Sequence, residues 1–403
     1  MELQPRRHGK DHAGNQGLRL GFGQVRNPPL PVAQGTGCLG TANDRQLRES
    51  PAQALGGYVS DRYRCAIVGV SGGRARGHAE AFAHMPRGEL TAVSTRTAEN
   101  LRLFADRWNV PHVYTDYAKM FREQDLDLVL VNTPPDVRLE ILEAADLNGV
   151  GSVIVEKPLA LQGEDWQALK EFAEQSSLKA AINHQLHYQP RRLALQALVH
   201  EGGIGPIQHL DASARMNMAY QGTHVLQAIQ AFQPSPPVAV STSLLRGATG
   251  LEPNPRMHLA PDECEAEIRF ADGSTGRFRC GTNAPADNPE DTRISHHKQV
   301  AVTGETGSVQ WTMTRWETRQ GDQHRHGTHD YHEEDIVGQA NMCEAMFDWL
   351  EDDTAVHALN LDSALQDFRL MLAMYMSGLS GRPENLEDPP MPDLLAGMRS
   401  RLA

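Results

Sequence analysis

The 403-residue chain contains few cysteines, and they follow no pattern typical of a disulfide framework or a metal site. Disulfide-rich secreted domains have even sets of cysteines, and zinc sites have cysteine or histidine pairs at short, fixed spacings. Here the number is odd and the spacings are wide. We therefore expect a reducing, cytoplasmic location and no metal, and we interpret the cysteines on neighbouring predicted strands as small buried side chains. The cysteines are Cys38, Cys65, Cys264, Cys280 and Cys343.

Long hydrophobic runs and an excess of positive charge are also missing. The longest apolar runs, such as residues 128–131, have the length of a strand, whereas a bilayer requires about 20 apolar residues. Lys and Arg number 38 against 51 Asp and Glu, which gives a net charge of −13. Nucleic-acid surfaces need clustered Lys and Arg. We therefore expect no membrane and no nucleic-acid partner, and we expect a small-molecule ligand.

Residues 1–60 show no helical or strand period and are rich in Gly, Pro, Gln, Asn and Arg. Such a composition cannot bury enough apolar surface to fold, and we expect a disordered tail. A start codon assigned too far upstream would give the same appearance. Arg6-Arg7 resembles a twin-arginine export signal, but no apolar segment follows it, which argues against export.

Residues 61–185 alternate short apolar strands with amphipathic helices. Near-continuous apolar strands of this kind indicate a parallel sheet that is covered on both faces. The predicted fold class here is α/β, a doubly wound Rossmann-type domain that binds its ligand at the carboxyl ends of the strands. The predicted strands are 65–70, 90–94, 126–132, 152–155 and 179–182, and the predicted helices are 77–85, 98–108, 137–147 and 164–175.

Residues 186–381 change to runs of strands joined by glycine-containing turns. This pattern predicts a second domain of α+β class with an open, mainly antiparallel sheet. Residues 382–403 are interpreted as a C-terminal tail with at most one short helix. The predicted strands are 207–212, 238–244, 264–270, 275–280, 299–302 and 308–313, and the predicted helices are 192–200, 223–232, 336–350 and 363–377.

A glycine-rich turn follows the first strand, in the sequence from Arg64 to His78. Glycines let the backbone approach a pyrophosphate, and the N–H groups and dipole of the next helix face the anion. A strict G-x-G-x-x-G beginning at Gly69 would place Ser71 and Arg74 at glycine positions, so the turn is rearranged or one residue longer. The alternative is a glycine-rich loop without a ligand.

The second strand ends without an acidic residue. An acidic side chain at this place would bind the ribose 2′-hydroxyl of NAD and repel the 2′-phosphate of NADP. The chain has Ser94, Thr95 and Arg96 there, whose hydroxyls and guanidinium suit a phosphate. We predict NADP as the cofactor, with NAD as the alternative.

Two further motifs follow later strands of the first domain: Asn132-Thr133-Pro134-Pro135 and Glu156-Lys157-Pro158-Leu159-Ala160. Two others lie in the second half of the chain: Gly222-Thr223-His224 and Gly304-Glu305-Thr306-Gly307-Ser308. In this order and spacing, over residues 62–382, they resemble the glucose-fructose oxidoreductase, inositol dehydrogenase and rhizopine catabolism (Gfo/Idh/MocA) family. The resemblance implies a nicotinamide cofactor and hydride transfer to or from a sugar, cyclitol or related polyol. It also implies a homodimer or homotetramer that forms through the second sheet.

The chain departs from the family pattern at several positions. Arg138 stands where a His often follows the T-P motif, and His184-Gln185 stand where an Arg pair is frequent. The D-x-x-x-H pair of the family becomes Tyr220 and His224, so a phenol replaces the carboxylate, and Gln227 replaces a common Asp. These departures leave the predicted fold unchanged and put the chemistry in question.

The resemblance assigns candidate residues to the cofactor and to catalysis. Lys157, Tyr220 and His224 are expected to meet at the substrate, with His224 or Lys157 moving the proton and Tyr220 as a hydrogen-bonding partner. Lys157 could instead be a surface residue that ends a strand, and His224 could be a core histidine. The cofactor is expected to contact Gly69, Ser71, Gly72, Gly73, Arg74, Ser94, Thr95, Arg96, Asn132, Thr133, Pro134, Glu156 and Lys157.

The histidine-rich run at residues 324–332 is the other candidate for chemistry. It could ligate a metal, but it lacks a helical metal-binding pair, and we interpret it as an exposed loop. The predicted function is that of an NAD(P)-dependent oxidoreductase that acts on a small polyol or carbonyl compound. Two alternatives stay open: glycoside cleavage through transient oxidation without net redox change, and a nucleotide-binding sensor without catalysis.

Overall fold

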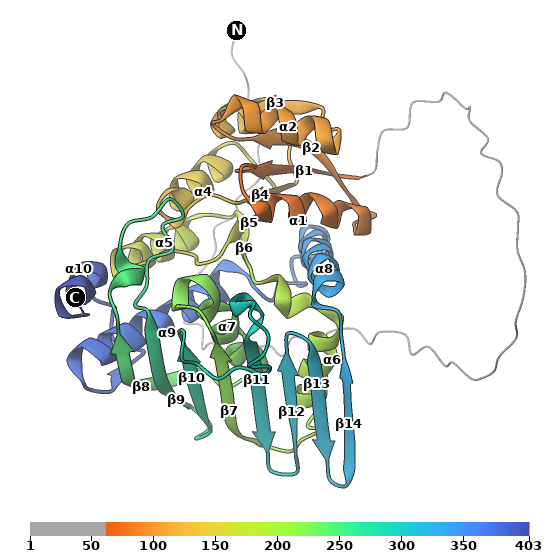
Figure 1. Ribbon diagram of the computed structural model, residues 1–403. Helices are drawn as coiled ribbons and strands as arrows, with labels where there is room; N and C mark the ends of the chain where they lie inside the picture. Colours follow the sequence, from red (N-terminus) through yellow and green to blue (C-terminus); the bar gives the residue numbers. More distant parts are fainter. Residues whose placement is uncertain (1–61, 403) are drawn as a thin grey trace, which may run out of the picture. The chain divides into compact units, whose positions relative to one another are not determined.

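The computed structural model describes residues 62–402. These residues build a parallel sheet, shown above in Figure 1, and a second, mainly antiparallel sheet, shown below it. This arrangement confirms the predicted fold class. Among residues 62–402, no helix is both long enough and apolar enough to cross a bilayer.

The parallel sheet has the strand order β3-β2-β1-β4-β5-β6. The order reverses between β1 and β4, and ligands of doubly wound sheets bind at the carboxyl ends of the strands beside such a reversal. The strands are β1 (Tyr63–Val68), β2 (Gly88–Ser94), β3 (His112–Tyr114), β4 (Leu128–Val131), β5 (Ser152–Glu156) and β6 (Lys179–Asn183).

Helices bury both faces of this sheet. Ile67 and Leu128 point into one hydrophobic cluster, while their neighbours Ala66 and Val129 point into the other. Because the side chains on both faces of every central strand are buried, the strands have continuous apolar sequences. The helices that connect the strands are α1 (Gly73–Ala81), α2 (Ala98–Trp108), α3 (Tyr117–Glu123), α4 (Arg138–Leu147) and α5 (Gly163–Gln175).

The second sheet has the order β14-β13-β12-β11-β7-β10-β9-β8-β15. Strand β7 pairs with β10 in parallel, and the other neighbouring pairs are antiparallel. Cys264 and Cys280 lie opposite each other on β9 and β10 as buried free thiols, as predicted. The strands are β7 (Ile207–Ala214), β8 (Pro237–Arg246), β9 (Glu263–Phe270), β10 (Thr275–Cys280), β11 (Lys298–Gly304), β12 (Gly307–Thr312), β13 (Arg315–Gln320), β14 (Gln323–Thr328) and β15 (Glu384–Asn385).

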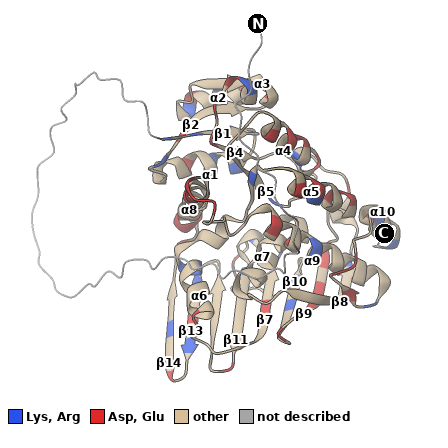
Figure 2. Ribbon diagram, turned by 180° about the vertical axis from the view of Figure 1, so that it is seen from behind, with Lys and Arg blue, Asp and Glu red and all other residues tan. Residues whose placement is uncertain are grey.

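Three helices pack on one face of the second sheet: α6 (Pro190–His200), α7 (Thr223–Phe232) and α9 (Leu361–Ser380). Helix α8 (Tyr331–Glu351) packs instead beside α1, where Figure 2 shows its acidic residues. There Arg87 forms an ion pair with Glu344, and the ring of Tyr63 stacks on Phe347 at 4.3 Å. Helix α8 therefore connects the second sheet to the first. The last helix is α10 (Leu394–Leu402).

Several predicted boundaries were wrong. Helix α1 begins at Gly73 rather than at residue 77; its start was predicted too late because Gly73, a residue of low helix propensity, occupies the first helical position. Strand β3 and helix α3 were missed, since β3 has three residues at the edge of the sheet and little apolar content. The histidine-rich run is not a loop: residues 323–328 form the edge strand β14, which is largely exposed and therefore lacks apolar alternation.

Candidate active site

The turn between β1 and α1 lies against the end of β4. Gly69 has φ +90°, a conformation that favours glycine, and a Cβ there would lie 3.0 Å from the main-chain oxygen of Asn132. The N–H of Gly69 donates to the carbonyl of Ser94 at the end of β2 (2.7 Å). The turn therefore brings the carboxyl ends of three strands together.

The start of α1 is open to a ligand. Gly72 precedes the helix, and no side chain caps its first N–H groups. A Cβ added at Gly72 would meet no atom within 4 Å. Uncapped N–H groups at a helix start favour an anion, and an open backbone lets it approach. Behind the turn, the Thr133 hydroxyl is buried without a hydrogen-bond partner among the described residues, so it is free to bind a polar ligand. These features fit the pyrophosphate and polar groups of a dinucleotide.

The hydroxyl-rich end of β2 lies beside the same turn. Thr95 Oγ1 is 3.2 Å from Ser71 Oγ, which also accepts a hydrogen bond from Asn100. Arg96 is exposed, and no hydrogen bond or ion pair within residues 62–402 engages its guanidinium. These groups are available to a ligand that reaches the end of β2.

Glu156 ends β5 in a network of hydrogen bonds. Its Oε1 accepts from Arg74 Nε (3.0 Å) and Asn183 Nδ2 (2.6 Å), and it lies 3.1 Å from His78 Nε2. Burial alone would raise the pKa of Glu156, but the His78 hydrogen bond and the Arg74 charge hold it well below its usual range. Arg74 also pairs with Asp335 of α8 (3.2 Å), so its guanidinium joins the end of β5 to α8.

Lys157 follows Glu156 and points to the second sheet. Its Nζ donates to the carbonyls of Tyr220 and, at 3.5 Å, of Ala219. Burial lowers the pKa of Lys157 to about 8; Glu156 opposes this shift, and the charges of neighbouring arginines add to it. Both protonation states of Lys157 are therefore populated near neutral pH. This contact with the main chain of Tyr220 joins the end of β5 to the turn that precedes α7.

Tyr220 lies in a single π-helical turn, Met218–Gly222, that precedes α7. The side chain of Asn217 accepts a hydrogen bond from the N–H of Tyr220 and fixes the start of this turn. The ring of Tyr220 meets the ring of His258 edge-on at 4.9 Å. His258 comes from the loop between β8 and β9, and no motif in the sequence predicted it.

His224, in the first turn of α7, is paired with His184, which follows β6. Their Nδ1 atoms are 3.3 Å apart, so one ring donates its Nδ1–H to the other. Burial, with the charges of Lys157 and Arg192, lowers the pKa of His184 to about 3. Burial, with Lys157 and His184, also lowers the pKa of His224 well below its usual value. Both imidazoles are neutral at pH 7, and Nε2 of His224 has no hydrogen-bond partner among the described residues.

Arg138 links two segments of the predicted cofactor site. Its guanidinium donates to the carbonyl of Thr133 through Nε (3.1 Å) and Nη2 (2.7 Å), and to the carbonyl of Pro158 through Nη1. The side chain is 2% exposed. The sequence identified Arg138 only as a departure from the family pattern; the contacts give it the role of positioning both loops.

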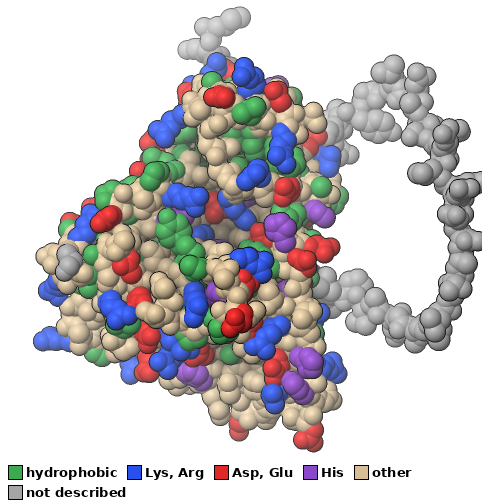
Figure 3. All heavy atoms as spheres, in the orientation of Figure 1, with side chains coloured by type: hydrophobic (Ala, Val, Ile, Leu, Met, Phe, Trp, Pro, Cys, Tyr) green, Lys and Arg blue, Asp and Glu red, His purple; other side chains and the backbone are tan. Residues whose placement is uncertain are grey.

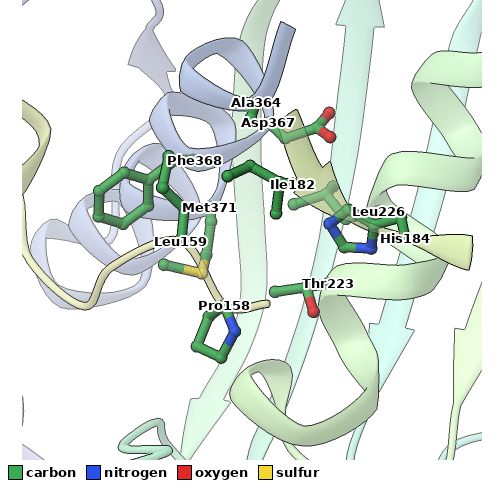
Figure 4. A pocket seen from close by; sticks show the side chains of 10 residues that line it. All are labelled: Pro158, Leu159, Ile182, His184, Thr223, Leu226, Ala364, Asp367, Phe368 and Met371. Atoms are coloured by element: carbon green, nitrogen blue, oxygen red, sulfur yellow. The ribbon is translucent and has the colours of Figure 1, made fainter. Parts of the chain in front are cut away.

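A small, mainly apolar pocket adjoins the site and is shown in Figure 4. His184 and Thr223 lie on one side of it, and Leu159 and Met371 on the other. Its ionisable side chains are His184 and Asp367, and burial raises the pKa of Asp367 to about 8. The pocket offers few groups to a polyol. It is lined by Pro158, Leu159, Ile182, His184, Thr223, Leu226, Ala364, Asp367, Phe368 and Met371.

The molecular surface and the side chains that could ligate a metal are the remaining features of the site. Figure 3 shows the molecular surface hollowed between the layers of the two sheets, with basic and histidine side chains near the hollow. Within residues 62–402, no three His, Cys, Asp or Glu side chains are grouped to hold a metal ion. In the histidine-rich run, His324 lies 2.9 Å from Glu317, and His329 lies 3.0 Å from Glu334.

Comparison with known proteins gives a match to the part of the chain that forms the parallel sheet. Residues 63–184 match the model of the Gfo/Idh/MocA oxidoreductase family, described as having an NAD-binding Rossmann fold. A D-apiose dehydrogenase of Paraburkholderia graminis is 26% identical over 144 residues, 36% of this chain and 38% of that protein. A glycosyl hydrolase family 109 protein of Streptomyces coelicolor is 29% identical over 153 residues, 36% of this chain and 32% of that protein. The chain thus spans about two fifths or less of the length of these curated relatives.

A solved structure extends the similarity to both sheets. Levoglucosan dehydrogenase in complex with NADH and levoglucosan superimposes with a TM-score of 0.69 at 17% identity. The superposition covers 81% of this chain and all of that one, 100%. At this identity the likeness establishes a shared two-layer fold.

Proposed function

The chain belongs to the Gfo/Idh/MocA family of NAD-binding oxidoreductases, and on this premise we propose that it is an NAD(P)-dependent dehydrogenase or reductase of a small polyol or the corresponding carbonyl compound. One observation carries the proposal. Lys157, at the carboxyl end of β5, donates to the main chain of Tyr220 in the turn that precedes the helix that holds His224. A titratable amine and a neutral histidine therefore lie together beside a dinucleotide-type corner.

The residues of the chain divide the chemistry as follows. When bound, a nicotinamide cofactor supplies the hydride acceptor or donor. An alcohol that loses a hydride must also lose its hydroxyl proton, and a positioned group must accept it. In its neutral form Lys157 can donate its two N–H groups to the carbonyls of Ala219 and Tyr220, which leaves its lone pair free for that proton.

His224 is suited to hold the substrate rather than to take its proton. The positive charges around it oppose formation of an imidazolium, and no carboxylate stands at position 220 to stabilise one. Its Nε2 can still donate to or accept from a substrate oxygen, according to the tautomer that His184 sets. Lys157 is therefore the proposed proton-transfer group, and His224 and Tyr220 are proposed to orient the substrate.

The proposed cofactor is NADP, with NAD as the alternative. The end of β2 lacks an acidic side chain, and it offers the exposed guanidinium of Arg96 beside the hydroxyls of Ser71 and Thr95. A guanidinium recognises a phosphate through paired hydrogen bonds. The open sheet further supports a homodimer or homotetramer, and the absence of a paired-cysteine pattern supports a cytoplasmic location.

A second candidate is glycoside cleavage through transient oxidation. The observation in its favour is the similarity of the first layer to a glycosyl hydrolase family 109 protein. In that reaction the cofactor would be tightly held and regenerated in each cycle. No net reduction of added cofactor would accompany turnover.

A screen of cofactors and substrates tests these candidates. Purified protein is incubated with NAD or NADP and a panel of polyols, aldoses and aryl glycosides, and both reduced cofactor and released aglycone are measured. Reduction of cofactor by a polyol or aldose supports the proposed function. Release of aglycone without net reduction supports glycoside cleavage instead, and cofactor binding without either product contradicts both enzymatic functions.

A further inference from the structure

Lys298 has a buried amine beside the candidate active site. It begins β11, its side chain is 2% exposed, and its Nζ donates to the carbonyl of Ser295. The ammonium also lies 5.8 Å from the ring centre of Tyr331. No carboxylate among the described residues comes within ion-pair distance of it. The charge of Lys157 reaches Lys298, and together with burial it lowers the pKa of Lys298 to about 7.

Two further buried cations of the site are also bound by neutral oxygens. Lys157 donates to the carbonyls of Ala219 and Tyr220, and Arg138 donates to those of Thr133 and Pro158. Among the ion pairs formed within residues 62–402, none includes either side chain. A carbonyl dipole satisfies an N–H group and does not neutralise its charge.

The acidic residues nearby are already engaged by another cation. Glu156 and Asp335 both pair with Arg74, at 3.0 Å and 3.2 Å. Asp335 also accepts a hydrogen bond from Gln185. Apart from Arg74 and these two carboxylates, the site holds the basic side chains Lys157, Lys298 and Arg138, and the acidic Asp136 also acts on Arg138. Basic side chains therefore outnumber acidic ones in the site.

Arg256 adds an accessible cation to this site. It lies in the loop between β8 and β9, two residues before His258, whose ring packs on Tyr220. The charge of Arg256 acts on both Lys157 and His258. Its side chain is exposed, and no described residue forms a hydrogen bond or ion pair with its guanidinium. A free guanidinium at the rim of a positive site is suited to bind a carboxylate through two hydrogen bonds.

We propose that the substrate is a sugar or polyol that carries a carboxylate, which Arg256 binds beside the cluster of basic side chains formed by Lys298, Lys157 and Arg138. This inference rests on the proposed function for the location of the substrate and adds its charge. Buried unpaired charges are costly, and an anionic ligand supplies the missing counter-charge. The hydroxyl to be oxidised lies at Lys157, and the carboxylate lies nearer the loop between β8 and β9.

Calorimetry with matched ligands tests the proposal. The protein is saturated with oxidised cofactor and titrated with galacturonate and galactose, glucuronate and glucose, and gluconate and glucitol. A hydrogen bond to a charged group changes affinity by about tenfold. We expect the carboxylate of at least one pair to bind about tenfold more tightly than its neutral partner. Equal or weaker binding of the carboxylate in every pair, or no binding by any ligand, overturns the proposal.

Variants identify the residues that recognise the charge. Arg256→Gln lies on an exposed loop and is expected to remove most of the carboxylate preference while affinity for the neutral partner is kept. Lys298→Met is expected to weaken the same preference, and Arg256→Lys to retain part of it. Arg319→Gln, an exposed position on β13, removes one charge elsewhere and serves as the control. A carboxylate preference that Arg256→Gln leaves unchanged overturns the assignment.

The failure of this proposal can be told apart from that of the proposed function. Neutral polyols that are oxidised while carboxylates bind no better overturn the anionic substrate and leave the dehydrogenase intact. Carboxylates that bind through Arg256 without any reduction of cofactor support the anionic ligand and overturn the dehydrogenase.

Discussion

Lys157 and His224 differ in how readily each accepts a proton in this site. Burial brings the pKa of Lys157 down to about 8, whereas burial and nearby cations push the pKa of His224 well below its ordinary value. A general base is most effective when its pKa lies near the working pH. The lysine meets that condition and the histidine does not.

This difference predicts the pH dependence of the reaction. Lys157 must be neutral to accept the hydroxyl proton, so kcat/KM for alcohol oxidation should rise with pH and level off above about 8. In the reductive direction the protonated form is needed, and the rate should fall above the same pH. Initial rates across the pH range, at saturating cofactor, measure both limbs. An oxidative limb centred near about 6.5, the ordinary pKa of histidine, would point to an imidazole base instead.

Tyr220 contacts Lys157 through its main-chain carbonyl, so replacing its side chain should leave this contact in place. Tyr220→Phe keeps the carbonyl that accepts from Lys157 and the ring that meets His258. We expect it to lower kcat by less than about tenfold, because only a substrate contact of the hydroxyl is lost. A loss of about a hundredfold or more in steady-state assays would show that the phenol itself takes part in proton transfer.

Arg96 is expected to determine the choice of cofactor. Its guanidinium is exposed at the end of β2 and is free to bind a 2′-phosphate. Arg96→Ala should weaken NADP binding by about tenfold and leave NAD binding nearly unchanged. Titration of cofactor fluorescence measures both affinities. Tighter binding of NAD than of NADP by the unmodified protein would contradict the proposed preference.

At the scale of elements, the β1–α1 corner depends on two glycines for different reasons. Gly69 has a positive φ and lies against the backbone of Asn132, so a side chain there would strain the protein itself. Gly72 has φ −104° and open space around it, so a side chain there would meet only a ligand. The two positions therefore separate folding from binding.

Alanine substitutions at these positions form a matched pair. Gly69→Ala should lower the free energy of unfolding by about 1–3 kcal/mol, the cost of a strained backbone conformation. Gly72→Ala should leave stability within about 0.5 kcal/mol and weaken cofactor binding. Denaturant melts and cofactor titrations of both variants provide the comparison. Equal stability of the two variants would contradict the account of the turn.

The strands and motifs of the first layer could be predicted because their signals are local. Continuous apolar strands, the glycine turn and the Glu156-Lys157-Pro158 segment each lie within a few residues of sequence. Strand β3 lacks such a signal, since its residues lie at a sheet edge and are partly exposed. The edge strand β14 was missed for the same reason.

At the scale of the whole molecule, the site draws on segments that only the tertiary fold brings together. Lys298 reaches it because β11 pairs with β7, and His258 because the loop after β8 folds over Tyr220. His184 becomes part of it by pairing with a histidine forty positions away. No spacing rule connects such residues, so the sequence predicted roles for Lys157, Tyr220 and His224, noted His184 only as a departure from the family pattern, and missed Lys298 and His258.

Lys157 is the proposed proton-transfer group between the two sheets, and Lys157→Met tests this role most directly. Turnover of the best substrate from the cofactor screen is compared between this variant and the unmodified protein, with cofactor affinity measured in parallel. We predict that kcat falls at least about a hundredfold while cofactor binding is largely kept, because the methionine fills the space but cannot accept a proton. Turnover within about threefold of the unmodified protein would contradict the account.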